Sequence, residues 1–537
     1  MAGTPDKKLR LLLVNPRQEL RHYALQDELA RLLGKQRLMP TYALPIVAAL
    51  TPDHWEVRIV DEDLGEAIPD GEKPDLVGIT SINATCRRAF EIADRFRADG
   101  VPVILGGVFA SSRPDAALEH ADAVVIGPAE PVWAQCLGDL EAGRLQRRYA
   151  GAERFDARTS PRPRWDLVDL RKVMSVEVRA STGCPYDCEF CLVPQLFGRK
   201  MSFRDVDEVV AEIASLPLKM LNFVDDNLTI RKPYARELMA KMKGLGAQWV
   251  CQSSLDVADD PELLAAMAEA GCIYVVIGFE SLNPASLRET GKKQNAIERY
   301  REAIKKIHAA GIQIIASFVV GFDSDTAEDF DRIVQFTHDN DLAFVMLHLL
   351  TVVEGTRLHA RMEREGRLCA IDPALLTGSF PSMHYYNFSQ IEIFNKYYET
   401  LERIYSVEAA RKKARSLFGT GAFQVERPGP VGAWAKLASS MTVLRRFVFT
   451  GDREKRRLFR ELFALARQKK VAMSSVVLFL LTMEGFRDHL AAARLRHDEM
   501  RARIAATDRG PWRLVEGAAP PPPRPLDRAC SEGAKSA

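Results

Sequence analysis

The sequence predicts an α/β protein with two strand–helix units followed by a helical part. Apolar runs alternate with helical segments from residue 9 to about 145, and the alternation resumes at Met174. From Gln390 to about Ala506 the pattern is almost entirely helical. Apolar runs separated by helices indicate parallel sheets that are covered on both faces. We therefore expect a doubly wound domain at 1–150, a linker at 151–172, a second unit at 173–390, a helical domain at 391–510 and a disordered tail at 511–537.

The N-terminal unit contains five expected strands, with a helix at 89–97 between the third and the fourth. The strands are Leu11–Val14, Trp55–Val60, Asp75–Thr80, Val103–Leu105 and Ala121–Ile126. Ligands of such a sheet bind outside the carboxyl ends of the strands. The candidate binding residues in the loops at those ends are Thr80, Ser81, Gly106, Gly107, Gly127 and Glu130. Glycines there let a large flat ligand approach the backbone closely.

Three of the nine cysteines lie within eight residues, at Cys184, Cys188 and Cys191. A zinc knuckle would need a fourth ligand at short range, but the next cysteine is Cys251. Disulfides are disfavoured because the cysteine count is odd and the chain starts without a secretory signal. Three thiolates on one loop can hold an iron–sulfur cluster whose remaining iron stays open for another ligand.

The second unit places this cysteine loop at the end of a strand. Its six expected strands are Met174–Arg179, Met220–Val224, Trp249–Gln252, Tyr274–Ile277, Ile314–Val319 and Phe344–Leu347. Helices are expected at 261–270 and 297–310, the latter stopped by Gly311. The cysteines follow the first strand directly, where barrel enzymes keep their chemistry.

The C-x3-C-x2-C spacing, with Phe190 before the last cysteine, resembles the signature of the radical S-adenosylmethionine (SAM) superfamily. The resemblance implies a partial (β/α)6 barrel, a 4Fe-4S cluster on the three cysteines, and SAM as the ligand of the open iron. Reductive cleavage of SAM would need an external electron donor such as flavodoxin or ferredoxin.

The same resemblance implies a set of SAM-binding residues at the strand ends, with Phe190 and Val320 beside the adenine. The others are Asp225, Asp226 and Asn227 for the amino group, Gln252 and Ser254 for the carboxylate or ribose, Glu280 for the ribose, and Arg288 for the carboxylate. Residues 225–227 also suit an Asx turn that closes a strand. Arg288 equally suits an exposed surface position.

The N-terminal unit resembles the cobalamin-binding domain that precedes the barrel in one large radical SAM subfamily. That domain usually has G-G-x-H-P and G-E-G-E tips, whereas this chain has Phe109, Ala110 and Pro128 there and lacks a D-x-H-x-x-G sequence. A flavodoxin-like domain kept for packing or substrate closure is the alternative.

The combination implies a cobalamin-dependent C-methyltransferase that acts on an unactivated carbon through a 5′-deoxyadenosyl radical. The alternative is a radical cyclase, a ring-rearranging enzyme or a carbon–carbon bond-forming enzyme without net methyl transfer. A methylthiotransferase acting on tRNA would carry three further N-terminal cysteines, but only Cys86 and Cys136 are present. A non-catalytic cluster or zinc protein is a further alternative.

Composition and the C-terminal pattern limit which partners and which location we expect. The net charge of +2 gives no general attraction to nucleic acid. The longest apolar run, Val471–Met483, is too short to span a bilayer, and we expect a cytoplasmic protein. Arg453–Arg460 is basic and amphipathic, which suits a solvated helical face or a peripheral membrane contact. The helical extension resembles that of enzymes acting on hopanoid lipids and bacteriochlorophyll precursors, which implies a small-molecule substrate, lipid-like or a tetrapyrrole.

Overall fold

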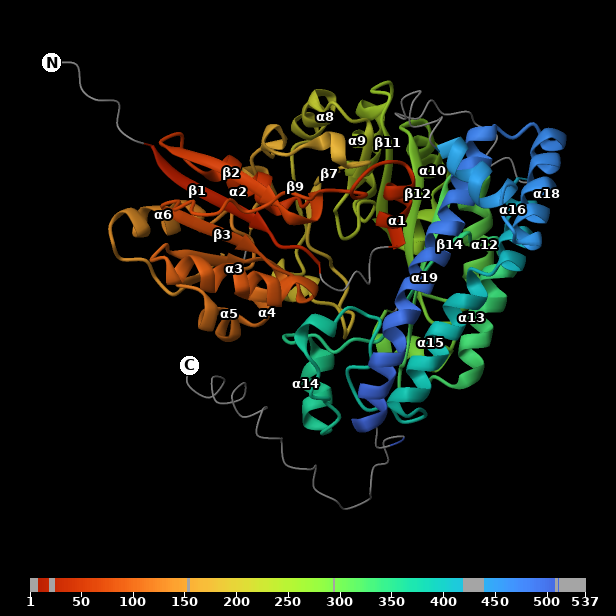
Figure 1. Cartoon of the computed structure of the whole chain (residues 1–537). Helices are drawn as coiled ribbons and strands as arrows, with labels where there is room; N and C mark the ends of the chain where they lie inside the picture. Colours follow the sequence, from red (N-terminus) through yellow and green to blue (C-terminus); the bar gives the residue numbers. More distant parts are fainter. Residues whose placement is uncertain are drawn as a thin grey trace.

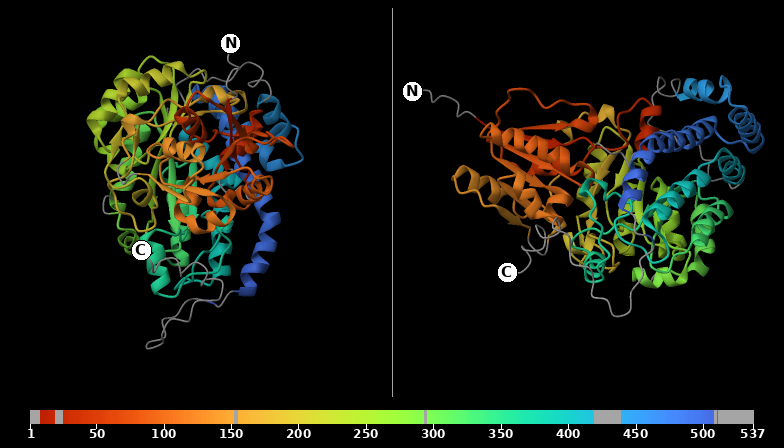
Figure 2. Two further views of the ribbon diagram at one scale, coloured as in Figure 1. Left: turned by 90° about the vertical axis from the view of Figure 1, so that its left-hand side faces the viewer. Right: turned by 60° about the horizontal axis from the view of Figure 1, so that its bottom comes forward.

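The computed structural model describes residues 8–18, 25–151, 155–292, 295–418, 439–507 and 510. The N-terminal sheet domain and the barrel lie side by side, and most helices after residue 390 pack on the other side of the barrel (Figures 1 and 2). Residues 511–537, expected to be a disordered tail, lie outside the described residues.

The N-terminal domain is a six-stranded parallel sheet in the order β2-β1-β3-β4-β5-β6. Its strands are β1 (Leu9–Asn15), β2 (Trp55–Asp61), β3 (Leu76–Thr80), β4 (Val103–Gly106), β5 (Ala123–Ile126) and β6 (Arg148–Ala150). Its helices are α2 (Ala43–Leu50), α3 (Cys86–Ala98), α4 (Gly107–Ser112), α5 (Pro114–His120) and α6 (Trp133–Glu141), whereas α1 (Leu25–Leu32), from the same part of the sequence, lies away from this sheet. The alternation along β1 divides the core, because Leu12 faces α3 and α5 while Leu13 faces α2 and α6. The expected doubly wound domain is confirmed, with β6 as an additional short strand.

The second domain is an open barrel of six parallel strands in the order β14-β13-β12-β11-β10-β7. The strands are β7 (Val176–Val178), β10 (Met220–Phe223), β11 (Gln248–Ser253), β12 (Cys272–Glu280), β13 (Gln313–Val320) and β14 (Phe344–Leu349). The helices between them are α7 (Val193–Leu196), α8 (Val206–Ser215), α9 (Lys232–Met242), α10 (Pro261–Glu269), α11 (Pro284–Thr290), α12 (Ile297–Ala309) and α13 (Ala327–Asp339). The expected partial (β/α)6 barrel is confirmed.

An N-terminal segment covers the open edge of the barrel beside β7. Gln36 N donates to Lys172 O at 2.7 Å, and Ser175 N donates to Leu38 O at 2.9 Å. Further along the segment, the amide of Asn222 on β10 lies 3.3 Å from the Met39 sulfur. Residues 36–39 therefore act as a partial extra strand, although they belong in sequence to the N-terminal domain. Helix α1, just before them, packs against the C-terminal helix α19 (Met473–Thr507).

The C-terminal part is helical, as expected. It comprises α14 (Arg357–Arg364), α15 (Gln390–Ile404), α16 (Val407–Leu417), a π-helical turn η8 (Leu444–Val448), α18 (Arg453–Lys469) and α19. Helix α15 begins with a capping box in which Ser389 and Glu392 satisfy each other's backbone N–H groups. In the part of the chain that the structure describes, no helix is long and apolar enough to cross a membrane.

Candidate functional site

The cysteine loop is enclosed by a short antiparallel ladder at the mouth of the barrel. Strands β8 (Ser181–Thr182) and β9 (Ser202–Phe203) pair on either side of it. Gly183 precedes the first cysteine with a φ of +92°, and a side chain there would meet the carbonyl oxygen of Lys200 at 3.0 Å. The loop therefore starts with a conformation and a close contact that favour glycine.

The three predicted cluster ligands are half-buried free thiols on this loop. Burial raises the pKa of Cys188 to about 12 and that of Cys191 to about 11, and it also raises the pKa of Cys184. Within the described residues, no three Cys, His, Asp or Glu side chains converge on a point that would suit a single metal ion. Each thiolate of a cluster site binds a different iron, so a cluster does not need such convergence. The donor set therefore fits an iron–sulfur cluster better than a mononuclear zinc.

A clamp from the segment after the barrel holds the cysteine loop. Arg361 of α14 donates from Nε to Glu189 Oε1 at 2.8 Å and from a terminal nitrogen to Asp323 Oδ2 at 2.7 Å. Leu358 N donates to Glu189 O at 3.0 Å, and the Arg357 guanidinium donates to Asp187 O at 2.6 Å. Glu189 lies between two of the cysteines, so α14 fixes the loop that presents the thiols.

Asp225 and Asp226 have different roles although they are adjacent. Asp225 is completely buried, and its carboxylate accepts from Ala180 N at 3.0 Å and from Ser181 Oγ at 2.6 Å. It therefore supports the start of the cysteine loop. Asp226 is half-buried and accepts from Gly183 N at 3.2 Å. Burial and the neighbouring Asp225 raise the pKa of Asp226 to about 7.

The next predicted residues also lie at strand ends, and two of them are tied together. Asn227 donates to Ser254 Oγ at 2.9 Å, and Ser254 also bonds the hydroxyl of Tyr186 in the cysteine loop. Gln252, on β11, is exposed. Of these three, Gln252 has the side chain most open to a ligand.

Glu280 is paired with a lysine that sequence reasoning missed. The Lys292 ammonium lies 2.7 Å from Glu280 Oε1 and 2.8 Å from Gly278 O, and it also interacts with Cys184 and Cys188. Lys292 lies in a loop after α11, with no periodic pattern to mark it. Arg288, the cation predicted for this role, is instead exposed on α11.

The two residues predicted to lie beside the adenine, Phe190 and Val320, differ in burial. The ring of Phe190 is 6.4 Å from that of Phe322, next to the end of β13. Val320 is itself buried in the barrel core. Of the post-barrel aromatic residues, Tyr385 is buried against Gly321, and Tyr386 lies under the Arg367 guanidinium at 4.0 Å.

The predicted cobalamin residues lie together at the carboxyl edge of the N-terminal sheet. Ser81 N donates to Gly106 O at 2.9 Å, which joins the tips of β3 and β4 beside Thr80. Gly107 has a φ of +88°, and a side chain there would meet Ser81 O at 2.6 Å and Thr80 Oγ1 at 2.9 Å. The loops after β3 and β4 are therefore in direct contact through their backbone atoms.

This edge faces the cysteine loop. A side chain at Gly127 would lie 3.5 Å from Leu196 O of α7, which follows the last cysteine. Glu130 forms an ion pair with Arg179, the residue after β7, at 2.5 Å. Both side chains are nearly buried, so Glu130 ties the two domains together at this point.

Two more ion pairs join the N-terminal domain to the segment after the barrel. Arg113 pairs with Glu354 at 3.1 Å, and Arg87 pairs with Asp372. Glu354 occupies the turn that follows β14. The carboxyl edge of the sheet is thus held against the barrel at several points.

Apolar side chains are exposed at the tips of the N-terminal sheet, which suits a large flat ligand. Ile82 and Val108, at the tips after β3 and β4, are both 38% exposed although the rest of the sheet core is buried. Apolar side chains exposed at a ligand edge favour burial under a ligand. The residues at these tips therefore fit a large flat group such as cobalamin, and the chain has no D-x-H-x-x-G sequence to supply a histidine to it.

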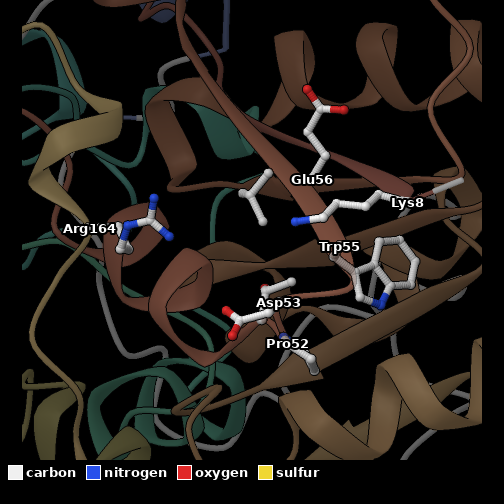
Figure 3. A pocket seen from close by; sticks show the side chains of 8 residues that line it. Lys8, Pro52, Asp53, Trp55, Glu56 and Arg164 are labelled. Atoms are coloured by element: carbon white, nitrogen blue, oxygen red, sulfur yellow. The ribbon is translucent and has the colours of Figure 1, made fainter. Parts of the chain in front are cut away.

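A separate pocket of about 260 Å³ lies at the opposite, amino edge of the same sheet (Figure 3). It is lined by Lys8 before β1, by Asp53, Trp55 and Glu56 around the start of β2, and by Arg164. Arg164 is already paired with Asp166 at 2.7 Å. None of the predicted site residues lines this pocket.

Three family models match the chain. The Radical SAM superfamily matches residues 178–337, the B12 binding domain matches residues 36–137, and a domain of unknown function, DUF4070, matches residues 356–499. The first two matches coincide with the barrel and with the N-terminal sheet domain.

Named relatives and a solved structure agree with these matches. Bacteriochlorophyllide d C-12(1)-methyltransferase of Chlorobaculum tepidum is 30% identical over 332 residues, 60% of this chain and 73% of that protein. Hopanoid C-2 methylase of Rhodopseudomonas palustris is 28% identical over 360 residues, 64% of this chain and 67% of that protein. The fold is similar to that of TsrM, a radical S-adenosylmethionine methyltransferase from Kitasatospora setae solved with cobalamin and a 4Fe-4S cluster. The TM-score is 0.56 at 17% identity, over 86% of this chain and 99% of that chain.

Proposed function

The chain belongs to the radical SAM superfamily, in the branch with a B12-binding domain, and we propose that it transfers a methyl group to an unactivated carbon of a small molecule. The proposal rests on one observation: the mouth of the barrel, with the cysteine loop, lies against the carboxyl edge of the N-terminal sheet. The cysteine loop and the carboxyl edge of the N-terminal sheet face each other, joined by the Arg179–Glu130 pair. A radical source and a methyl donor held at those edges would share one substrate.

The chain's residues divide between three cofactors. Cys184, Cys188 and Cys191 would hold a 4Fe-4S cluster, Asp226 and Gln252 would face SAM, and the tips after β3, β4 and β5 would hold cobalamin. When bound, the cluster and SAM supply a 5′-deoxyadenosyl radical and cobalamin supplies the methyl group.

Charged side chains around the thiols orient this site. Lys292 places a cation beside Cys184 and Cys188 and holds Glu280 in one position. Arg361 fixes the cysteine loop through Glu189. A loop held in one geometry costs less to organise when ligands bind.

We propose an apolar acceptor, lipid-like or a tetrapyrrole. In four neighbouring strands, a half-buried apolar residue stands between two buried ones that face the outer helices. These residues are Val250, Val276, Ile315 and Met346. Alternation in a barrel places them toward the interior, where they give apolar surface beside the polar Gln252 and Ser317, which pair with Val276 and Met346. Relatives named for a bacteriochlorophyllide and for a hopanoid support this class.

The partners follow from the chemistry. We propose that an external donor such as flavodoxin or ferredoxin reduces the cluster, and that the enzyme works in the reducing cytoplasm. None of the eight cysteines among the described residues is in a disulfide, which supports a reducing compartment. The substrate would then come from solution or from a peripheral membrane contact.

Anaerobic reconstitution of the full chain tests the proposal. Cys184→Ala should lower bound iron and abolish SAM cleavage, whereas Cys369→Ala, a matched half-buried cysteine outside the loop, should change neither. Full iron and full SAM cleavage in Cys184→Ala would overturn the cluster assignment. With extracted metabolites and methyl-labelled SAM, label in a new product supports methyl transfer. Label confined to SAM and methionine would favour the radical cyclase or rearrangement alternative.

A further inference from the structure

Exposed apolar side chains are concentrated in one stretch of the C-terminal domain. Among the described residues, seven large hydrophobic side chains are exposed, and five of them lie within residues 441–473. These five are Met441 (60%), Leu444 (40%), Phe449 (79%), Phe463 (39%) and Met473 (40%). The other two are Ile82 and Val108, at the expected cobalamin edge. Apolar side chains gathered in this way mark a binding surface rather than random exposure.

The same stretch is strongly basic. Residues 441–473 contain ten Lys and Arg against three Asp and Glu, a net charge of +7 in a chain whose total is only +2. The rest of the chain is therefore net negative. Arg446 and Lys455 turn inward to Glu484 of α19, but Arg445, Arg453, Arg460 and Arg467 are exposed.

Helix α18 presents the apolar and basic groups together. Leu458, Leu462 and Ala466 recur every four residues and are buried. With residues spaced at 100°, Phe463 lies on the flank of the helix, about 100° from the centre of the buried face, and Arg460 and Arg467 lie next to it, further round toward the exposed side. The Phe463 ring stacks on that of Phe459 at 6.0 Å.

The turn η8 and helix α18 lie at the margin of the molecule, on the side remote from the N-terminal domain (Figure 1). The surface therefore lies away from the domain interface. Phenylalanines beside arginines suit a lipid headgroup layer, because aromatic rings enter the acyl boundary while guanidinium groups bind lipid phosphates.

We propose that residues 441–473, the basic apolar face, dock the enzyme on an anionic lipid bilayer. Charge complementarity favours an anionic bilayer, and a symmetric dimer through this face is disfavoured because it would bring together two charges of +7. The inference rests on the proposed function, because a bilayer is where a lipid-like acceptor of the proposed class would be met. Binding to lipid does not depend on methyl transfer, so the two can fail separately.

Vesicle flotation with the full chain tests the docking surface. Vesicles of phosphatidylcholine with phosphatidylglycerol should capture the wild-type protein, and pure phosphatidylcholine should capture much less. Phe449→Ser with Phe463→Ser should weaken capture by about a hundredfold, about tenfold for each ring withdrawn from the bilayer. Arg460→Glu with Arg467→Glu should also weaken it by at least about tenfold and reduce its salt dependence.

A matched charge reversal serves as control. Arg301→Glu with Lys305→Glu reverses two exposed cations on α12, on the outer wall of the barrel, and should leave capture unchanged. Circular dichroism and SAM cleavage in solution establish that each variant is folded. The proposal is overturned if anionic vesicles fail to capture the wild type, or if the α12 and α18 reversals weaken capture equally. It is also overturned if the phenylalanine pair governs a concentration-dependent dimer, or binding of tRNA, and not vesicle capture.

Discussion

Gly107→Ala isolates the contact between the tips of β3 and β4. Two costs arise from the structure. Alanine at a φ of +88° costs about 1 kcal/mol relative to glycine. In addition, the new Cβ would lie 2.6 Å from Ser81 O and 2.8 Å from Ser81 N, both backbone atoms that cannot rotate away. Relieving such overpacking costs a further 1–3 kcal/mol, by rough analogy with cores.

The matched control is Gly143→Ala. Gly143 has a φ of +66°, a Cβ added there would have no atom within 4 Å, and the residue follows α6 at the other edge of the sheet. It shares the conformational cost and lacks the contact. We expect Gly107→Ala to lower the free energy of unfolding of the N-terminal domain by about 2–4 kcal/mol, against about 1 kcal/mol for Gly143→Ala.

The displaced tips should also bind cobalamin at least about tenfold more weakly, which corresponds to about 1.4 kcal/mol. Urea unfolding followed by circular dichroism measures the stability, and equilibrium dialysis against hydroxocobalamin measures the affinity. Equal cobalamin affinity in the two variants would refute the placement of the ligand across these tips. Equal stability would refute the close contact itself.

Three further outcomes follow from the charged groups. Lys292→Met should weaken SAM binding to the reconstituted protein at least about tenfold, because it leaves the buried carboxylate of Glu280 unpaired. Arg288→Met, at an exposed position of α11, should leave SAM binding unchanged. Equal SAM affinities in the two variants would contradict the role given to Lys292. Arg361→Leu should speed the loss of iron under air, measured by the decay of cluster absorbance, and Arg364→Leu on the same helix should match the wild type. Burial lowers the pKa of Lys413 to about 7. The unfolded chain therefore binds the Lys413 proton more tightly than the folded protein, and the free energy of unfolding of the wild type should rise between pH 7 and 10. Lys413→Met should remove that rise and be the more stable protein at pH 7, as read from urea midpoints; an unchanged pH slope would exclude Lys413 as its source.

The sequence predicted the strands well because each is a short apolar run bounded by helices. Both sheets, the parallel direction of their strands and the position of the cysteine loop at a strand end are confirmed. Local pattern could not distinguish Asp225 from Asp226, since only the position of residues 180–183 decides which carboxylate turns toward the loop.

Contacts between side chains far apart in the sequence could not be predicted either. Arg361 meets Glu189 from 172 positions away, and Lys292 lies in a loop without periodicity. Glu130 was predicted from its place at a strand end, and only the packed domains reveal that Arg179 occupies its carboxylate. The roles of the SAM and cobalamin residues stay predictions.

Residues 36–39 limit how the barrel can be treated as a module. A chain that begins at residue 173 would keep all six strands of the barrel but would uncover the backbone N–H groups of Met174 and Ser175 next to β7. Uncovered strand edges recruit other chains, so such a fragment would aggregate. The barrel can therefore be excised as a folded unit only together with this part of the preceding domain. Its boundary in space is not its boundary in sequence.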